Sequence, residues 1–336
     1  MPSPADILLA LLLAAAIIYA TTAGADFGGG VWDLLARGPR KQAQRKLIER
    51  AITPVWEVNH VWMILMVIIL FSGFPRAYSA ISTALHIPLT LMLLGIVARG
   101  TAFTFRAYDS KSDDVQRRWG LIFSGASVIT PLLLGIVVGS VASGEIQLEG
   151  SIVISGFLDP WTSSPFVWSV GALTLALFAY IAAVYLTNEA DEELLAEDFR
   201  RKALVSGAVA SALAGLTFIL AKTGAPSIHD RIADHAVLLF SAALVSSVAA
   251  ITTLWIRRYR LARLLAIAQV TLIVGGWGAA QYPYLLSDAL DITAASSPPH
   301  VQSLIACTLA IGILPLGGCI YYLMRVFKRS TGVEAP

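Results

Sequence analysis

Apolar residues occur in long runs along the whole chain, separated by short polar connections. A helix that spans a membrane needs about 20 mostly apolar residues, and nine stretches meet this requirement. They are residues 5–22, 55–74, 79–98, 119–141, 164–187, 203–221, 235–256, 264–283 and 302–324. The pattern predicts an all-α polytopic membrane protein with about nine transmembrane helices. Residues 1–336 then form a single transmembrane domain, and no soluble domain is expected.

The composition agrees with this prediction. Hydrophobic residues make up 57% of the 336 positions and charged residues only 14%, which is far from the usual composition of a soluble globular protein. The chain is therefore placed in the membrane class before any motif is considered.

Basic residues predict how the helices are oriented. If nine helices are counted, all of the 24 Lys and Arg residues except Arg76, Lys222 and Arg231 fall on one side of the membrane. Cytoplasmic loops carry the excess of basic residues, so the N-terminus is expected outside and the C-terminus in the cytoplasm. Because topology explains these basic loops, no nucleic-acid partner is expected.

Ionisable residues in or beside a membrane span are candidates for function, and the segment Pro54–Trp62 at the start of the second span holds two of them. Glu57 and His60 are spaced to share one helical face, where they could pass protons. Pro54 is expected to fix the start of this helix. The alternative is a structural role, in which the Glu57 carboxylate is only stabilised by the positive N-terminal end of the helix dipole and His60 lies at the level of the lipid headgroups.

Three further charges are expected at the same inner face of the membrane. Asp26 follows the first predicted span, and Arg99 and Arg106 follow the third. Carboxylates and arginines buried together must pair or lose their charge. We therefore expect Asp26 or Glu57 to contact Arg99 as a structural clamp, which is compatible with a role in proton uptake.

Haem ligation usually needs a positioned His or Met. Only some of the histidines lie near predicted spans, and no two share one span as a facing pair; the five are His60, His86, His229, His235 and His300. Spacings of Cys and His typical of metal sites are also missing from the sequence. We expect the chain to bind neither a haem nor a metal of its own.

The sequence resembles subunit II of the cytochrome bd family of bacterial and archaeal quinol oxidases over nearly its whole length. The motifs that carry the resemblance are Ala23–Gly28 with Gly30, Pro54–Trp62, Phe74-Pro75 with Tyr78, and Arg99–Arg106. The chain departs from the usual family pattern at Ala23, Val58 and His60.

The resemblance implies two four-helix bundles plus one peripheral helix, with the quinol-oxidising loop and haem b, and in some members haem d, in the partner subunit I. It implies that Glu57 lines a polar path for cytoplasmic protons. Our candidates for this path are Glu57, Asp26, His60 and Asn59, and those for a structural clamp are Arg99, Arg106, Trp56 and Trp62.

The expected function is therefore that of a haem-free subunit in a complex that oxidises quinol, reduces oxygen to water and contributes to a proton gradient. The expected location is the cytoplasmic (inner) membrane of a prokaryote, with subunit I, small single-helix accessory subunits and lipid as partners. Two alternatives are a secondary transporter and a purely structural scaffold. A transporter would carry broken helices in matching halves and a polar site at the midplane, whereas the charges here gather at one face.

Overall fold

The computed structural model describes residues 3–108 and 113–330, without the side chains of Glu57, Arg106, His235 and a few others. The long helices are α1 (Pro4–Leu34), α2 (Lys41–Gly73), α4 (His86–Tyr108), α5 (Asp113–Ser143), α7 (Pro165–Glu189), α8 (Glu193–Gly224), α10 (Val237–Trp255), α11 (Tyr259–Gln281) and α13 (Pro299–Ser330). The short elements are α3 (Pro75–Ala84), β1 (Leu148–Glu149), β2 (Ile152–Val153), α6 (Asp159–Thr162), α9 (Pro226–Arg231), the π-helical turn η1 (Ile232–Ala236), β3 (Tyr284–Leu286), β4 (Leu290–Asp291) and α12 (Ile292–Ala295).

The described helices are long and apolar enough for a membrane protein with many spans. Eight of them pass as single spans by length and composition, and α2 adds a ninth if its two halves, Lys41–Thr53 and Val58–Gly73, form one span with a bend of 48°. The predicted all-α polytopic fold is confirmed. Which end of the helices faces the cytoplasm stays a prediction.

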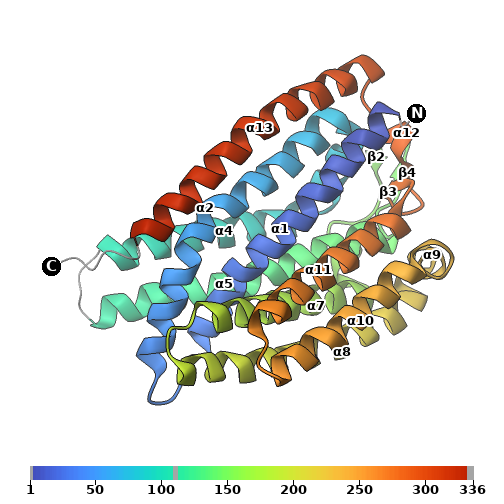
Figure 1. Cartoon of the computed structure of the whole chain (residues 1–336). Coiled ribbons are helices and arrows are strands. Elements are labelled where there is room, and N and C mark those ends of the chain that lie inside the picture. The colour runs from blue at the N-terminus through green and yellow to red at the C-terminus, as the bar shows by residue number, and fades with distance from the viewer. Residues whose placement is uncertain (1–2, 109–112, 331–336) are drawn as a thin grey trace.

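The long helices pack as two bundles of four, with one helix outside them. The first bundle contains α1, α2, α4 and α5, and the second contains α7, α8, α10 and α11. The bundles meet where α1 and α5 pack against α7. Helix α13 lies along the flank formed by α2 and α1 (Figure 1). The arrangement is that of two four-helix bundles plus one peripheral helix.

Glycines let α1 approach three neighbours at once. A Cβ atom added at Gly28 would lie 2.0 Å from the backbone oxygen of Phe178 in α7, and one at Gly30 would lie 2.1 Å from Ser127 Oγ in α5. One at Gly29 would lie 2.3 Å from a side chain of α2. Small residues allow this close approach where helices meet in lipid. The glycine run therefore packs α1 at the centre of the molecule.

Two of the predicted helix ends were wrong. Helix α1 continues to Leu34 instead of ending near residue 22, because its polar and glycine positions are covered by neighbouring helices. Asp26 is therefore inside the helix and does not follow it. Helix α2 begins at Lys41 rather than at Pro54. A proline within a helix removes one hydrogen bond and bends the axis without always ending it, and the bend lies between Thr53 and Val58.

The third predicted span, residues 79–98, was also displaced. The chain breaks between α3 and α4, and the stretch suited to a membrane is His86–Phe105. Arg99 is therefore an interior residue of α4 rather than a residue beyond its end. This change places Arg99 at a depth where only protein groups can satisfy its charge.

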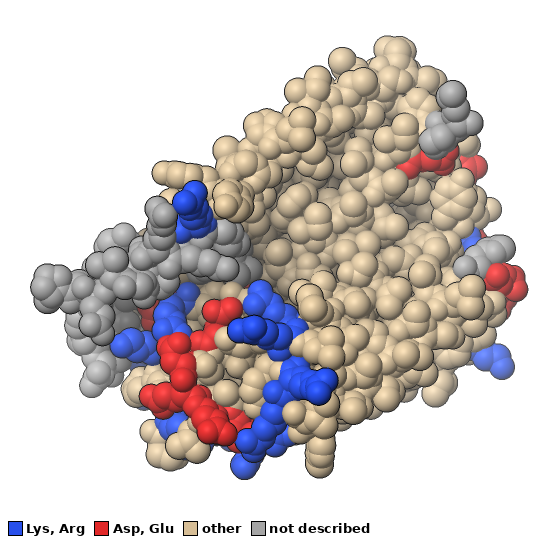
Figure 2. Space-filling view, in the orientation of Figure 1, with Lys and Arg blue, Asp and Glu red and all other residues tan. Residues whose placement is uncertain are grey.

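Charged side chains gather at the two ends of the bundles (Figure 2). At the end that holds the start of α8, ion pairs connect separate segments: Arg40 with Asp198, Arg50 with Asp191, and Arg257 with Glu193. At the opposite end, Arg231 lies 3.7 Å from Asp288, and Arg76 donates to the backbone oxygens of Gly150 and Ala294. Described basic residues of the two sets thus lie at opposite ends: Arg40, Arg50 and Arg257 at the first, and Arg76 and Arg231 at the second. We call the first of these the basic end.

Candidate functional site

A buried ion pair joins α1 to α4 inside the first bundle. The side chains of Asp26 and Arg99 are 0% and 1% exposed. Arg99 Nη1 donates to Asp26 Oδ2 at 3.0 Å, while Nη2 bonds Oδ1 and also donates to the Asp26 backbone oxygen at 3.1 Å. The planar guanidinium therefore meets both carboxylate oxygens, which is the strong two-pronged geometry of Arg and carboxylate.

Two more helices complete the hydrogen bonding of this pair. Asn59 of α2 donates from Nδ2 to Asp26 Oδ2 at 2.6 Å, and Arg99 Nε donates to Ser127 Oγ of α5 at 2.9 Å. A buried ion pair is tolerated only when further hydrogen bonds satisfy its remaining atoms. Residues from all four helices of the first bundle thus meet here, and we call Asp26, Asn59, Arg99 and Ser127 the inner cluster.

Aromatic rings cover the guanidinium. The Cζ atom of Arg99 lies 4.7 Å from the ring centres of both Phe27 and Phe123. A ring face attracts a cation at this distance, and more strongly when water is excluded. The rings therefore supply an apolar surface that is also electrostatically suited to Arg99.

Two further sequence candidates on α2, Trp56 and His60, lie near the inner cluster without belonging to its ion pair. His60 Nδ1 lies 3.0 Å from the backbone oxygen of Trp56, and their rings are 5.7 Å apart. The Trp56 ring also lies 5.8 Å from that of Phe103 in α4. Trp56 therefore packs between α2 and α4, and His60 packs against Trp56 on α2.

Trp62 packs against the apolar cluster that contains Tyr19 and Phe27. Within the described part of the chain, the buried Nε1 of Trp62 and the buried Oδ1 of Asn59 have no hydrogen-bond partner. They are a donor and an acceptor, one turn apart on α2. Buried polar atoms of this kind are commonly satisfied by ordered water.

Two candidates cannot be placed in this site. The side chains of Glu57 and Arg106 lie outside the described residues, although their backbones belong to α2 and α4. Of the contacts expected between Arg99 and either Asp26 or Glu57, the one with Asp26 is present. The pairing expected between Glu57 and His60 stays a prediction, as do the roles of all these residues in proton transfer.

Sequence reasoning missed a second buried carboxylate, Asp33, in the last turn of α1. Its side chain is 2% exposed. Ser124 Oγ of α5 donates to Asp33 Oδ2 at 3.0 Å, and Arg45 Nε lies 3.6 Å from Oδ1. The spacing of seven residues from Asp26 places both carboxylates on one face of a continuous helix. The signal was lost because the helix was expected to end near residue 22.

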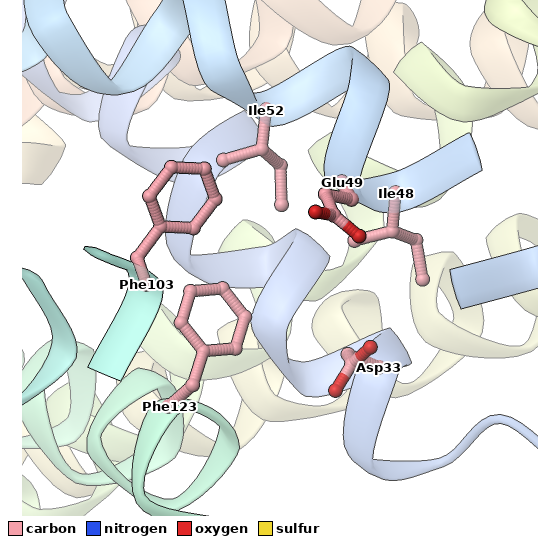
Figure 3. Close-up of a pocket in the computed structure, with 6 residues that line it drawn as sticks. All are labelled: Asp33, Ile48, Glu49, Ile52, Phe103 and Phe123. Carbon is pink, nitrogen blue, oxygen red and sulfur yellow. The ribbon is translucent and has the colours of Figure 1, made fainter. Parts of the chain in front are cut away.

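A small cavity lies next to Asp33, among α1, α2, α4 and α5 (Figure 3). Its volume is about 10 Å³, and it is lined by Asp33, Ile48, Glu49, Ile52, Phe103 and Phe123. A space of this size is about what one water molecule requires. Phe123 both lines the cavity and covers Arg99, so the cavity and the inner cluster share a wall.

Within residues 3–108 and 113–330, no three His, Cys, Asp or Glu side chains lie close enough together to bind a metal ion. The histidines with described side chains are on four different helices: His60 on α2, His86 on α4, His229 on α9 and His300 on α13. Whether the chain binds a haem or a metal of its own stays a matter of prediction.

Comparison with known proteins identifies the family. The model of the family described as cytochrome bd terminal oxidase subunit II matches residues 4–327. This chain belongs to that family. The resemblance found in its motifs is therefore confirmed, and the subunit II family accounts for both bundles and for most of α13.

Individual members of the subunit II family are similar at low identity. A Bacillus subtilis (strain 168) protein assigned as a cytochrome bd menaquinol oxidase subunit II is 23% identical, with 93% of this chain and 92% of that protein covered. The cytochrome bd-I ubiquinol oxidase subunit 2 of Escherichia coli (strain K12) is 31% identical over 130 residues, which are 38% of this chain and 32% of that protein.

A solved structure shares the fold. A chain of the bd oxidase from Geobacillus thermodenitrificans matches with a TM-score of 0.82 at 22% identity, covering 96% of this chain and 98% of that one. The two-bundle arrangement of this subunit II chain is therefore the fold of that oxidase chain.

Proposed function

We propose that this chain is a haem-free subunit of a quinol oxidase in a prokaryotic cytoplasmic membrane. A haem-bearing partner subunit oxidises quinol and reduces oxygen to water, and this chain provides part of the route by which protons reach the partner. The observation that carries the proposal is the family match over residues 4–327. The relatives' names add ubiquinol and menaquinol as the substrate class. The match favours an oxidase subunit over a secondary transporter.

The proposed direction of proton movement follows from the distribution of charge. The basic end is the cytoplasmic end if the usual excess of basic residues in cytoplasmic loops holds. Reduction of oxygen to water consumes protons, so a route from that end into the bundle is useful to the complex. The charged and amide side chains of the inner cluster supply polar groups in the interior of the bundle, whereas helix surfaces that face lipid are apolar.

Within this proposal the residues near Asp26 have different tasks. Arg99 holds Asp26 through both carboxylate oxygens, which favours a fixed charged pair over a mobile proton carrier. Glu57 precedes Asn59 by two positions in α2, and we assign proton transfer to Glu57 and His60. The completeness of the Arg99 hydrogen bonds favours a second reading, in which the inner cluster only clamps the helices.

The division of labour is tested by expressing this chain with and without the haem-bearing subunit from its own genome. We expect quinol-dependent oxygen uptake only when both are present. The haem absorbance should follow the partner when the two chains are separated. Oxygen uptake by this chain alone, or haem that stays with it, would contradict the proposal.

The proton role is tested by Glu57→Gln in the assembled complex. We expect slower proton uptake and slower turnover, with an unchanged haem spectrum. The matched control is Glu193→Gln, because Glu193 is an acidic residue at the same end whose side chain is 86% exposed. Equal turnover in both variants would leave the inner cluster as a clamp without a proton role around Glu57.

A further inference from the structure

Asp33 is a buried carboxylate that the inner cluster does not use. It occupies the last turn of α1, which ends at Leu34. The end of a helix where carbonyl groups point outward is an unfavourable place for a negative side chain, and burial adds a desolvation cost. Helix stability alone therefore gives no reason for an acid at this position. Its neighbours suggest a role in moving protons.

Asp33 connects the basic end to the buried interior. On one side, Arg45 of α2 lies 3.6 Å from Asp33 Oδ1 and keeps a third of its own side chain exposed. On the other side, Ser124 Oγ donates to Asp33 Oδ2 at 3.0 Å, and Ser124 is 1% exposed. The same carboxylate thus contacts a group that reaches the surface and a group that is buried.

Two hydroxyl groups of α5 lie on the way from Asp33 to the inner cluster: Ser124 Oγ donates to Asp33, and Ser127 Oγ donates to the backbone oxygen of Phe123 at 2.7 Å. Ser124 and Ser127 are one turn apart on α5, so both face α1 from the same side of the helix. Ser127 Oγ accepts from Arg99 Nε at 2.9 Å, and Arg99 binds Asp26. Seven residues of α-helix separate Asp26 from Asp33, which is about 10 Å along the axis. Ser124 and Ser127 lie within this interval.

The cavity beside Asp33 supplies the remaining space. Its volume of about 10 Å³ suits about one water molecule. Glu49, which is exposed at the basic end, lines the same cavity as Asp33. The ring of Phe123 forms the wall towards Arg99. The Asp33 carboxylate, a space that suits about one water molecule, and the Ser124 and Ser127 hydroxyls, one turn apart on α5, therefore lie between the basic end and the inner cluster.

We infer that Asp33 loads protons from the basic end, through Ser124 and the adjoining cavity, towards Ser127 at the edge of the inner cluster. Asp33 takes a proton from water at the basic end and becomes a neutral acid. It then gives that proton to water in the cavity, or to the Ser124 hydroxyl as this group passes its own proton to that water, and returns to the carboxylate. Only protons move in this step. The inference rests on the proposed function, because the protons must serve a reaction in the partner subunit.

The test uses the assembled oxidase with Asp33→Asn, Asp33→Glu and the control Asp198→Asn. Asp198 is also an acid at the basic end that pairs with an arginine, Arg40, but it belongs to α8 in the second bundle. We measure proton uptake during reaction of the reduced complex with oxygen, together with quinol-driven turnover and the haem spectrum. A positioned proton-transfer group contributes a factor on the order of 100.

For Asp33→Asn we expect proton uptake slower by about tenfold to a hundredfold, with an unchanged haem spectrum. Asp33→Glu, which keeps the carboxyl group, should recover most of the rate. Asp198→Asn should match the unchanged complex. A purely structural role for Asp33 predicts instead that Asp33→Glu is as harmful as Asp33→Asn, or that neither changes proton uptake, and either result overturns the inference.

Failure of this inference is distinguishable from failure of the proposed function. If Glu57→Gln slows proton uptake and Asp33→Asn does not, the proton route exists but does not begin at Asp33. If neither slows it, the proposed proton role of the whole chain is wrong. Should Asp33→Asn not assemble, Ser124→Ala removes the buried partner of Asp33 and tests the same link. Normal proton uptake in an assembled Ser124→Ala complex would also overturn the inference.

Discussion

Arg99 binds Asp26 at three oxygen atoms, two of the carboxylate and one of the backbone. These residues are 73 positions apart in the chain, and each is interior to its own helix. The pair therefore fixes α4 against α1, while Asn59 and Ser127 bring in α2 and α5. One connected set of hydrogen bonds thus joins all four helices of the first bundle.

Removing the positive partner should destabilise the bundle strongly. Arg99→Met keeps much of the side-chain volume but leaves Asp26 buried and without its counter-ion. Loss of one member of a buried pair costs about 3–5 kcal/mol, so we expect a lower melting temperature of the purified complex. The control Arg40→Met breaks the pair with Asp198, where Arg40 is 37% exposed, and should cost at most about 1 kcal/mol.

The double variant Asp26→Leu with Arg99→Met checks the reason for this loss. Replacing both members of a buried ion pair with apolar side chains is often neutral or stabilising. The double variant should therefore melt at a higher temperature than Arg99→Met alone. A double variant that is less stable than Arg99→Met would show that the pair stabilises the bundle by more than avoiding a lone buried charge.

Close packing at Gly28 can be tested in the same way. In Gly28→Ala the new methyl group would lie 2.0 Å from a backbone oxygen of Phe178, so α1 and α7 must separate. Overpacking typically costs about 1–3 kcal/mol, and we expect a lower melting temperature. The matched control is Gly215→Ala in α8, where nothing lies within 4 Å of the new atom. Alanine favours a helix over glycine by roughly 1 kcal/mol, so the control should be neutral or slightly stabilised.

The sequence was sufficient to predict about nine spans, though not their ends, and a contact of Arg99 with either Asp26 or Glu57; the structure shows the contact between Asp26 and Arg99. Length and hydrophobicity determine which segments can cross a membrane. Charged side chains within membrane spans avoid lipid and pair with one another inside the bundle, which brings these two residues together. Both arguments depend only on residue types and their order along the chain.

Helix ends and the role of Asp33 could not be predicted in this way. The end of an apolar run predicts the end of a helix near residue 22, yet α1 continues through Asp26 and Asp33 to Leu34. Its polar groups are satisfied by Asn59, Arg99 and Ser124 from other helices. Such tertiary partners are invisible in the local pattern. Had the helix been extended, the spacing of seven residues would have drawn attention to Asp33.

The orientation in the membrane can be measured directly. Cys307 and Cys319 are free and exposed, so they are first replaced by serine. A single cysteine is then introduced at Arg201, in the basic end, or at Ser151, in the loop at the opposite end. On intact cells, a reagent that cannot cross the membrane should label Ser151→Cys, and Arg201→Cys only after permeabilisation. The reverse pattern would place the basic end outside and contradict the proposed direction of proton uptake.

Combining Asp33→Asn with Glu57→Gln asks whether one route or two leads into the bundle. Side chains that act in the same sequence of steps show strongly non-additive effects when both are removed. We expect a single route, because both residues lead to the pair of Asp26 and Arg99: Asn59, two positions beyond Glu57, binds Asp26, and Asp33 binds Ser124, one turn before the Ser127 that binds Arg99. The double variant should then take up protons no more slowly than the slower single variant. A rate reduced by the product of the two single effects would instead indicate that Asp33 and Glu57 serve separate routes, and the haem spectrum of each variant shows whether the complex is intact.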